Sequence, residues 1–131
     1  MLAHMQHSPG FLALVADARR RIRECTVADV HKRLERGDRF HFIDVREDSE
    51  FAVDHAVGAR HIGRGLLERD IERLIPDKAA DIVLYCGGGY RSALAADSLQ
   101  RMGYTNVVSM DGGISGWREA GYAIEPGGDT R

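Results

Sequence analysis

The chain has 131 residues, 44% of them hydrophobic and 29% charged, and a net charge of −2 at pH 7. This composition predicts one soluble globular domain, and it excludes an electrostatic case for binding nucleic acid or an anionic membrane surface. No apolar run is long enough to cross a bilayer. Two cysteines, Cys25 and Cys86, are too few for a secreted disulfide framework, so we expect a reducing compartment and a cytoplasmic protein.

The first element expected is an amphipathic helix within a helical extension at residues 1–21. Ser8 and Pro9 suit the N-cap and the first helical position. One face is formed by Phe11, Leu14 or Val15, Ala18 and Ile22. The four arginines between residues 19 and 23 are expected to be a solvated face. We expect the apolar face to pack on its own domain, with a partner protein or a homodimer as the alternative.

From residue 22 onward, short β-forming runs alternate with helical patterns. Strands are expected at 21–26, 40–45, 59–62, 81–86 and 106–110, and helices at 26–37, 47–55, 65–75, 91–103 and 115–121. The run DIVLYC at 81–86 is nearly all apolar, as in a central strand buried on both faces. The alternation predicts an α/β domain over residues 22–125, with a mostly parallel central sheet and helices on both faces. A flexible tail is expected at 126–131.

The stretch YCGGGYRSA, residues 85–93, joins this central strand to the next helix. Ligands of open α/β sheets bind beyond the carboxyl ends of the strands, which is where Cys86 falls. The three glycines allow the loop to curl its backbone N–H groups around an anion, at the positive end of the following helix. A helix N-terminus and a nearby arginine also lower the pKa of a thiol. The loop therefore predicts a thiolate nucleophile at Cys86, with Arg91 placed to pair with an oxyanion.

The same loop also has plainer interpretations. A cysteine that ends a buried strand can be an inert core residue, and a glycine run can be a tight turn. The loop lacks the Lys-Ser/Thr pair of a Walker motif and the GxGxxG pattern of dinucleotide sites. We expect a reactive cysteine because the cysteine, the glycines, the arginine and the helix start coincide at the correct end of the strand. The sequence implies no cofactor and no metal site.

These motifs together resemble the rhodanese-like sulfurtransferase family. The loop matches its Cys-x-x-Gly-x-Arg pattern at 86–91. The segment FIDVREDSEF is similar to the family's Asp-Val-Arg motif, and MGYTNVVSMDGGISGWREAGY to its C-terminal signature. The segment DHAVGARHIG stands where the family has Gly-His-Ile-Pro-Gly-Ala, and departs from it at Asp54, Ala56 and Val57. The resemblance covers about residues 22–125.

The resemblance implies a three-layer rhodanese-like fold and ping-pong sulfur transfer. Cys86 would take the sulfane sulfur of a small sulfur-containing anion such as thiosulfate, or of a persulfide donor, and hold it as a persulfide. A thiol, a protein sulfur acceptor or cyanide would then remove it. Arg91 would close the loop and help to bind the anion. The implied cradle consists of Gly87, Gly88, Gly89 and Tyr90.

Two other functions stay open. One is a non-enzymatic persulfide relay or binding module, and the other is a Cys-based phosphatase or arsenate reductase. Phosphatases of the related kind place five residues between the cysteine and the arginine, whereas this chain places four between Cys86 and Arg91. The tighter ring favours sulfur transfer.

Several residues outside the loop are expected to support the fold rather than to react. Asp44 and Arg46 are expected to pair and to brace the loops near the site. We expect structural hydrogen bonds from His55, a core or rim position under the last helix for Trp117, and a small apolar role in the core for Cys25.

Overall fold

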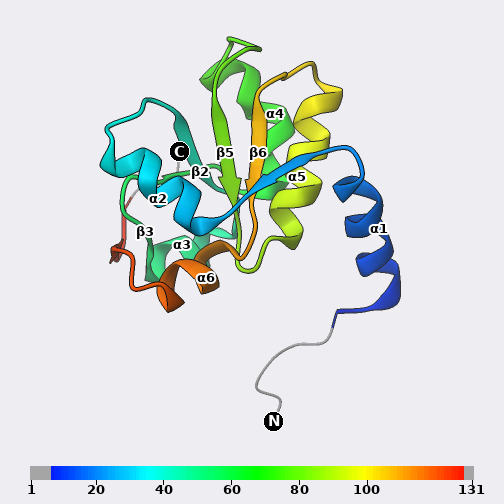
Figure 1. Cartoon of the computed structure of the whole chain (residues 1–131). Coiled ribbons are helices and arrows are strands. Elements are labelled where there is room, and N and C mark those ends of the chain that lie inside the picture. The colour runs from blue at the N-terminus through cyan, green and yellow to red at the C-terminus, as the bar shows by residue number, and fades with distance from the viewer. Residues whose placement is uncertain (1–6, 129–131) are drawn as a thin grey trace.

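The structure is a computed structural model, and it describes residues 7–128. Its helices and strands alternate along the chain (Figure 1). In order they are α1 (Pro9–Arg19), β1 (Arg23–Cys25), α2 (Val27–Glu35), β2 (His41–Asp44), α3 (Asp48–Val53), β3 (His55–Ala56), β4 (Arg60–His61), α4 (Arg64–Leu74), β5 (Ile82–Tyr85), α5 (Tyr90–Arg101), β6 (Val107–Met110), α6 (Gly113–Glu119) and β7 (Ile124–Glu125).

The central sheet has five strands in the order β1-β6-β5-β2-β4, and every neighbouring pair is parallel. β5 lies in the middle, where Val83 pairs with Phe42 of β2 and with Val108 of β6. All four residues of β5 are buried, as its apolar sequence predicts for a strand covered on both faces. The predicted mostly parallel α/β sheet is confirmed.

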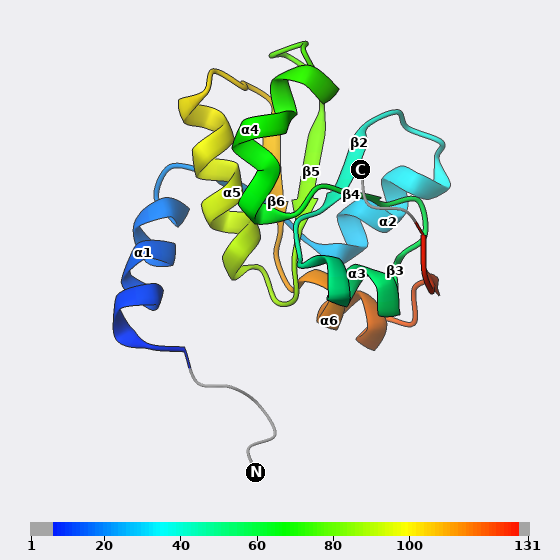
Figure 2. The ribbon, with the colours of Figure 1, turned by 180° about the vertical axis from the view of Figure 1, so that it is seen from behind.

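Helices cover both faces of this sheet. Alternate strand residues face opposite sides, so Ile43 and Leu84 pack with α4 and α5, whereas Phe42 and Val83 pack with α2 and α6. Figure 2, the view from behind, shows α4 and α5 in front of the sheet, on the side opposite to α2. The three-layer arrangement therefore follows from the period-two pattern of the strands.

Local sequence signals determine several element boundaries. Thr26 and Asp29 form a capping box at the start of α2, with both hydrogen bonds 3.0 Å long. Gly37 and Gly103, the expected stops of two helices, have φ angles of +75° and +101°. α6 begins at Gly113, two residues before the expected start. Gly112 and Gly113 both have positive φ angles, and they form the turn into the helix.

Helix α1 packs beside α5, as both ribbon views show. Val15 and Ala18 are each 1% exposed and form the buried face, whereas Leu14 points outward. Ile22 lies beyond the helix end and is partly buried against the α4–α5 side of the core. Ser8 occupies the N-cap, but its side chain makes no capping hydrogen bond. The expected packing of α1 on its own domain is confirmed.

The arginines between residues 19 and 23 are largely exposed, as expected, but Arg19 and Arg21 also contact α5. Arg21 donates to both carboxylate oxygens of Asp97 in α5, at 2.9 and 2.8 Å. The guanidinium of Arg19 lies 5.1 Å from the centre of the Tyr90 ring. Arg20 and Arg23 are both exposed, and the exposed fraction of the Arg20 side chain is 81%. The cluster therefore fastens α1 to α5.

A second, two-stranded sheet pairs β3 with β7 in antiparallel fashion, and the sequence analysis did not predict it. Each strand has two residues, which is too short for an alternating pattern to be recognised. Gly127 then donates to the carbonyl oxygen of Ala52, 2.9 Å away. The predicted flexibility of 126–131 stays a prediction, and residues 1–6 and 129–131 of the expected termini lie outside the described part. Between residues 7 and 128, no helix has the length and the apolar character needed to cross a membrane.

Candidate active site

Cys86 directly follows the central strand β5, and its side chain is 1% exposed. The backbone N–H groups of Gly89 and Ser92 donate to its Sγ at 3.2 and 3.3 Å. The hydroxyl of Ser92 lies 3.5 Å from Sγ and 2.8 Å from the Ser109 hydroxyl. Gly89 has a φ of +106°, a conformation that favours glycine and lets the loop close over the sulfur.

The start of α6 holds the opposite side of this loop. Ile114 N–H donates to the carbonyl of Cys86 at 2.9 Å, and Ser115 N–H to the carbonyl of Gly87 at 3.1 Å. In a planar trans peptide, the C=O and the following N–H point in opposite directions. The N–H groups of Gly87 and Gly88 therefore point away from α6, and both residues line the pocket next to Cys86.

The pair Gly112-Gly113 makes this contact between α6 and the loop possible. A Cβ atom on Gly113 would lie 2.3 Å from the carbonyl oxygen of Cys86 and 2.6 Å from that of Gly87. The sequence analysis noted the glycine pair only as part of a family signature. Its physical role was missed because the contact joins segments that are far apart in the sequence.

A pocket of about 670 Å³ opens over Cys86. The residues that line it come from the start of α1 and the residues just before it, from α3, from the Cys86 loop and from α6. The lining residues are His7, Phe11, Glu50, Cys86, Gly87, Gly88, Tyr90, Arg91 and Ser115. The structure thus brings the predicted loop residues together around one hollow, with Gly89 buried behind it. His7, Phe11 and Ser115 were not among the predicted site residues.

Arg91 is paired within the protein. Its guanidinium donates to both carboxylate oxygens of Glu50 in α3, at 2.7 and 3.1 Å. The hydrogen bond from Arg91 holds the pKa of Glu50 below its usual range, and the bond to Glu50 raises the pKa of Arg91. The sequence analysis missed Glu50 as a site residue, although the acidic segment after Arg46 was the available signal.

The predicted pair of Asp44 and Arg46 is confirmed. Asp44 is fully buried, and it accepts hydrogen bonds from the Arg46 guanidinium at 2.8 to 3.1 Å. Arg46 also donates to the carbonyl oxygen of Asp54 at 2.6 Å. The end of β2 is thereby tied to the end of α3, the helix that carries Glu50.

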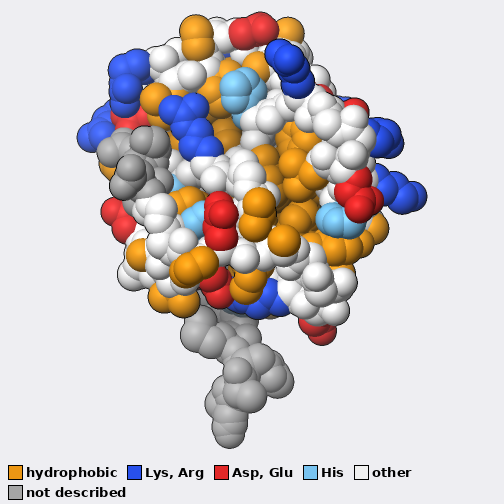
Figure 3. All heavy atoms as spheres, turned by 90° about the vertical axis from the view of Figure 1, so that its left-hand side faces the viewer, with side chains coloured by type: hydrophobic (Ala, Val, Ile, Leu, Met, Phe, Trp, Pro, Cys, Tyr) orange, Lys and Arg blue, Asp and Glu red, His pale blue; other side chains and the backbone are white. Residues whose placement is uncertain are grey.

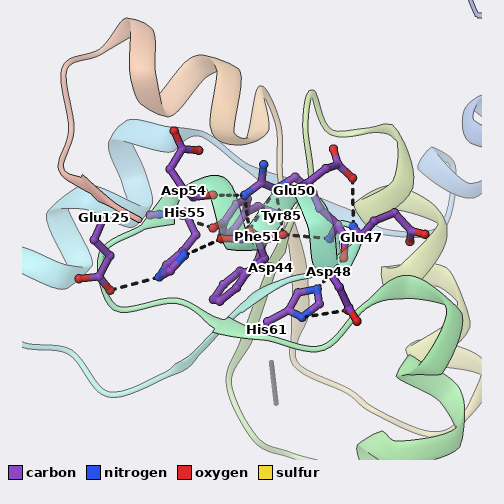
Figure 4. A network of polar contacts seen from close by, with 12 residues as sticks. Asp44, Glu47, Asp48, Glu50, Phe51, Asp54, His55, His61, Tyr85 and Glu125 are labelled. Atoms are coloured by element: carbon purple, nitrogen blue, oxygen red, sulfur yellow. Dashed lines mark hydrogen bonds and ion pairs between the residues drawn. The ribbon is translucent and has the colours of Figure 1, made fainter. Parts of the chain in front are cut away.

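Two histidines fix the other side of α3 (Figure 4). The ring of His55 stacks on Phe51 at 3.8 Å between centroids, and that of His61 at 4.7 Å. His55 also lies 3.1 Å from the Phe51 carbonyl and 3.2 Å from the Glu125 carboxylate. His61 donates to the Arg46 carbonyl at 2.6 Å. The structural role expected for His55 is confirmed.

The second cysteine belongs to the opposite face of the sheet. Cys25 packs partly buried with the α2–α6 cluster, whereas Cys86 belongs to the α4–α5 cluster. Burial raises the pKa of the Cys25 thiol to about 11. The apolar role expected for Cys25 is confirmed. Trp117 is 1% exposed and lies in the same cluster, as expected for an anchor of α6.

Another hollow of about 330 Å³ lies on the face of α2, where Figure 3 shows hydrophobic side chains gathered. Its walls include His31, Leu34, Val57 and Trp117, and it contains no cysteine. Within the described residues, no group of three or more His, Cys, Asp or Glu side chains is arranged to hold a metal ion.

Comparison with known proteins identifies relatives of this chain. Residues 26–120 match the family model of the rhodanese-like domain. The chain is 35% identical over 72 residues to the thiosulfate sulfurtransferase PspE of Escherichia coli (strain K12), an alignment that covers 55% of this chain and 69% of that protein. It is 37% identical over 75 residues to the uncharacterized protein YqhL of Bacillus subtilis (strain 168), covering 57% of this chain. The chain spans 58% of the length of that relative, and 21% of the length of another, longer relative.

Solved structures show the same fold. A protein of unknown function from Rhodopseudomonas palustris CGA009, RPA3614, named as a possible tyrosine phosphatase, superimposes with a TM-score of 0.81 at 30% identity. The match covers 93% of this chain and 98% of that one, and so includes the region of α1.

Proposed function

The chain belongs to the rhodanese-like domain family, and on that premise we propose that it is a sulfurtransferase working through a persulfide on Cys86. The observation that carries the proposal is the setting of Sγ. It lies at the base of a pocket, and the N–H groups of Gly89 and Ser92 donate to it. A reducing, cytoplasmic setting is part of the proposal, since both cysteines are free thiols.

In the first step, the Cys86 thiolate attacks the sulfane sulfur of thiosulfate or of a persulfide. A new S–S bond forms on Sγ while the S–S bond of the donor breaks. The electron pair of the broken bond leaves with sulfite, or with a thiolate when the donor is an organic persulfide. Cys86 keeps a persulfide, whose negative charge the inward N–H groups of the loop and the positive end of α5 stabilise.

In the second step, an acceptor thiol or cyanide attacks the outer sulfur of this persulfide. The bond from the outer sulfur to Sγ breaks, and its electron pair returns to Cys86 as the thiolate. Cyanide leaves as thiocyanate, and a thiol leaves as a persulfide. The cycle is covalent catalysis of the ping-pong type and needs no redox cofactor, because sulfane sulfur is only exchanged between sulfur and carbon nucleophiles.

The charge pattern of the pocket supports sulfur transfer over phosphoester hydrolysis. The alcohol or phenol released from a phosphoester is helped by a proton from a general acid, whereas sulfite leaves as a stable anion. Among the described residues that line the pocket, Glu50 has the one carboxyl group, and it is held as a carboxylate by Arg91. No proton donor of the carboxylic type is therefore offered at this site.

Steady-state kinetics with thiosulfate and cyanide test the proposal. We expect thiocyanate formation with parallel double-reciprocal lines, and none from Cys86→Ala, with Cys25→Ala as the matched control that keeps activity. Hydrolysis of p-nitrophenyl phosphate without thiocyanate formation would replace the proposal with the phosphatase alternative. Stoichiometric sulfur loading with negligible turnover would favour the relay module.

A further inference from the structure

The pocket over Cys86 has an aromatic wall that comes partly from outside the region matched to the family. His7 and Phe11 lie before residue 26, where the family match begins. The Tyr90 ring lies 4.5 Å from that of His7 and 6.1 Å from that of Phe11, between centroids, and the other two rings are 5.2 Å apart. All three residues line the pocket. One wall is therefore an aromatic surface built by α1 and α5 together.

Helix α1 holds this wall in a defined place. Val15 is buried against the domain, and Arg21 forms the two-point pair with Asp97 of α5. The Arg19 guanidinium lies over the Tyr90 ring and also pairs with Glu24 at 3.2 Å. Val15 lies about one turn before Arg19, and Arg21 lies just beyond the helix end, so these contacts hold the C-terminal half of α1, the helix that carries Phe11.

The opposite wall has no net charge. Arg91 and Glu50 neutralise each other through two hydrogen bonds. Among the described lining residues there is no Lys, no Asp and no further Arg or Glu side chain. A dianion such as thiosulfate meets the loop N–H groups here but no unpaired cation, whereas an apolar group meets aromatic rings.

We propose that this pocket selects a sulfur donor in which the sulfane sulfur is bonded to a second sulfur that carries an apolar organic group of aromatic size. The organic group lies against Phe11 and Tyr90 while the sulfane sulfur reaches Cys86. The inference rests on the proposed function and narrows its donor class. Removing a phenyl group from water against such a wall is worth about tenfold or more in kcat/KM over a methyl group.

Thiosulfonates provide matched probes, because they differ from thiosulfate only in the group attached to the sulfonyl sulfur. The Cys86 thiolate takes the sulfane sulfur of R–SO2–S⁻, the S–S bond of the donor breaks, and R–SO2⁻ leaves with the electron pair. The donors are thiosulfate, methanethiosulfonate and benzenethiosulfonate, each with cyanide as the acceptor. We expect benzenethiosulfonate to exceed methanethiosulfonate in kcat/KM by about tenfold.

Substitution of Phe11 tests whether the wall causes this preference. Phe11→Ala is expected to bring the benzene-to-methane ratio close to one, mainly by lowering kcat/KM for benzenethiosulfonate. Leu14→Ala is the control, because Leu14 lies on the same helix and is 61% exposed. Phe11→Lys supplies a cation at the same place, and it is expected to raise kcat/KM for thiosulfate several-fold at low salt while lowering it for benzenethiosulfonate.

The three donors distinguish a failure of the proposed function from a failure of the donor preference. If none of the three donors places sulfur on Cys86, the proposed function is wrong. If all three load Cys86 and the benzene-to-methane ratio is the same in the native protein and in Phe11→Ala, the sulfurtransferase stands and the aromatic wall does not select the donor. Native-like urea unfolding of Phe11→Ala shows that a loss of preference is not a loss of fold.

Discussion

Replacing Gly113 with alanine is expected to damage both the stability and the activity of this protein. Gly113 has a φ of +54°, and its Cβ position lies 2.3 Å from the Cys86 carbonyl oxygen, where ordinary contact begins at 3.4 Å. The Cys86 loop must therefore move by about 1 Å, which breaks the hydrogen bonds from Ile114 and Ser115. Strain at positive φ costs about 1 kcal/mol, and each lost hydrogen bond about 1 kcal/mol more.

Gly121→Ala is the matched control for this substitution. Gly121 follows α6 and has a φ of +77°, with nothing within 4 Å of its Cβ position. It therefore measures the backbone strain alone, about 1 kcal/mol, against about 3 kcal/mol for Gly113→Ala. Urea unfolding gives both values. A displacement near 1 Å at a reacting group also predicts a roughly hundredfold loss in kcat/KM for thiosulfate. Equal stability and equal turnover in the two variants would refute the role given to Gly113.

Three further results are expected. Because the pKa of Glu50 is lowered, its pair with Arg91 stabilises the fold above the ordinary carboxyl pKa, and this stabilisation is lost as pH falls through the lowered pKa. The unfolding free energy of Glu50→Gln should therefore vary less with pH in the acid range than that of the native protein. The same pH profile for both proteins in urea unfolding would contradict this. In Cys86→Ala, the rate of alkylation of Cys25 by iodoacetamide should rise with pH up to about pH 11, because burial raises the pKa of the Cys25 thiol. A rate that levels off near neutral pH would contradict the raised pKa. Val15→Ala should lower the free energy of unfolding by about 2 kcal/mol, since the side chain is fully packed between α1 and the domain, and an unchanged urea midpoint would show that α1 is not docked.

The fold could be predicted where its signals are local. The apolar run of β5 and the glycine that ends the helix expected at 26–37 each act within a few residues, and each appears as expected. The two-residue strands β3 and β7 could not be predicted, because their pairing depends on where the rest of the chain places them. The pair of Arg21 with Asp97 could not be predicted for the same reason, since the two residues are 76 positions apart.

The residues of the site also divide into those that the sequence predicts and those that only the fold brings together. Cys86, the glycines and Arg91 fall within one short loop, so their proximity was visible in the sequence. Glu50 lies 41 residues from Arg91, and only the packing of α3 against the loop brings the two together. Phe11 reaches the pocket because α1 runs along α5, and no periodic pattern specifies that direction. Distances between elements, rather than residue types, were the missing information.

The mass of the intact protein after exposure to thiosulfate, and again after cyanide, tests the central claim most directly. The account predicts a gain of one sulfur atom that cyanide removes, present in Cys25→Ala and absent in Cys86→Ala. A protein whose mass stays unchanged with thiosulfate and with benzenethiosulfonate, although its Cys86 thiol is free and the fold intact, would contradict it.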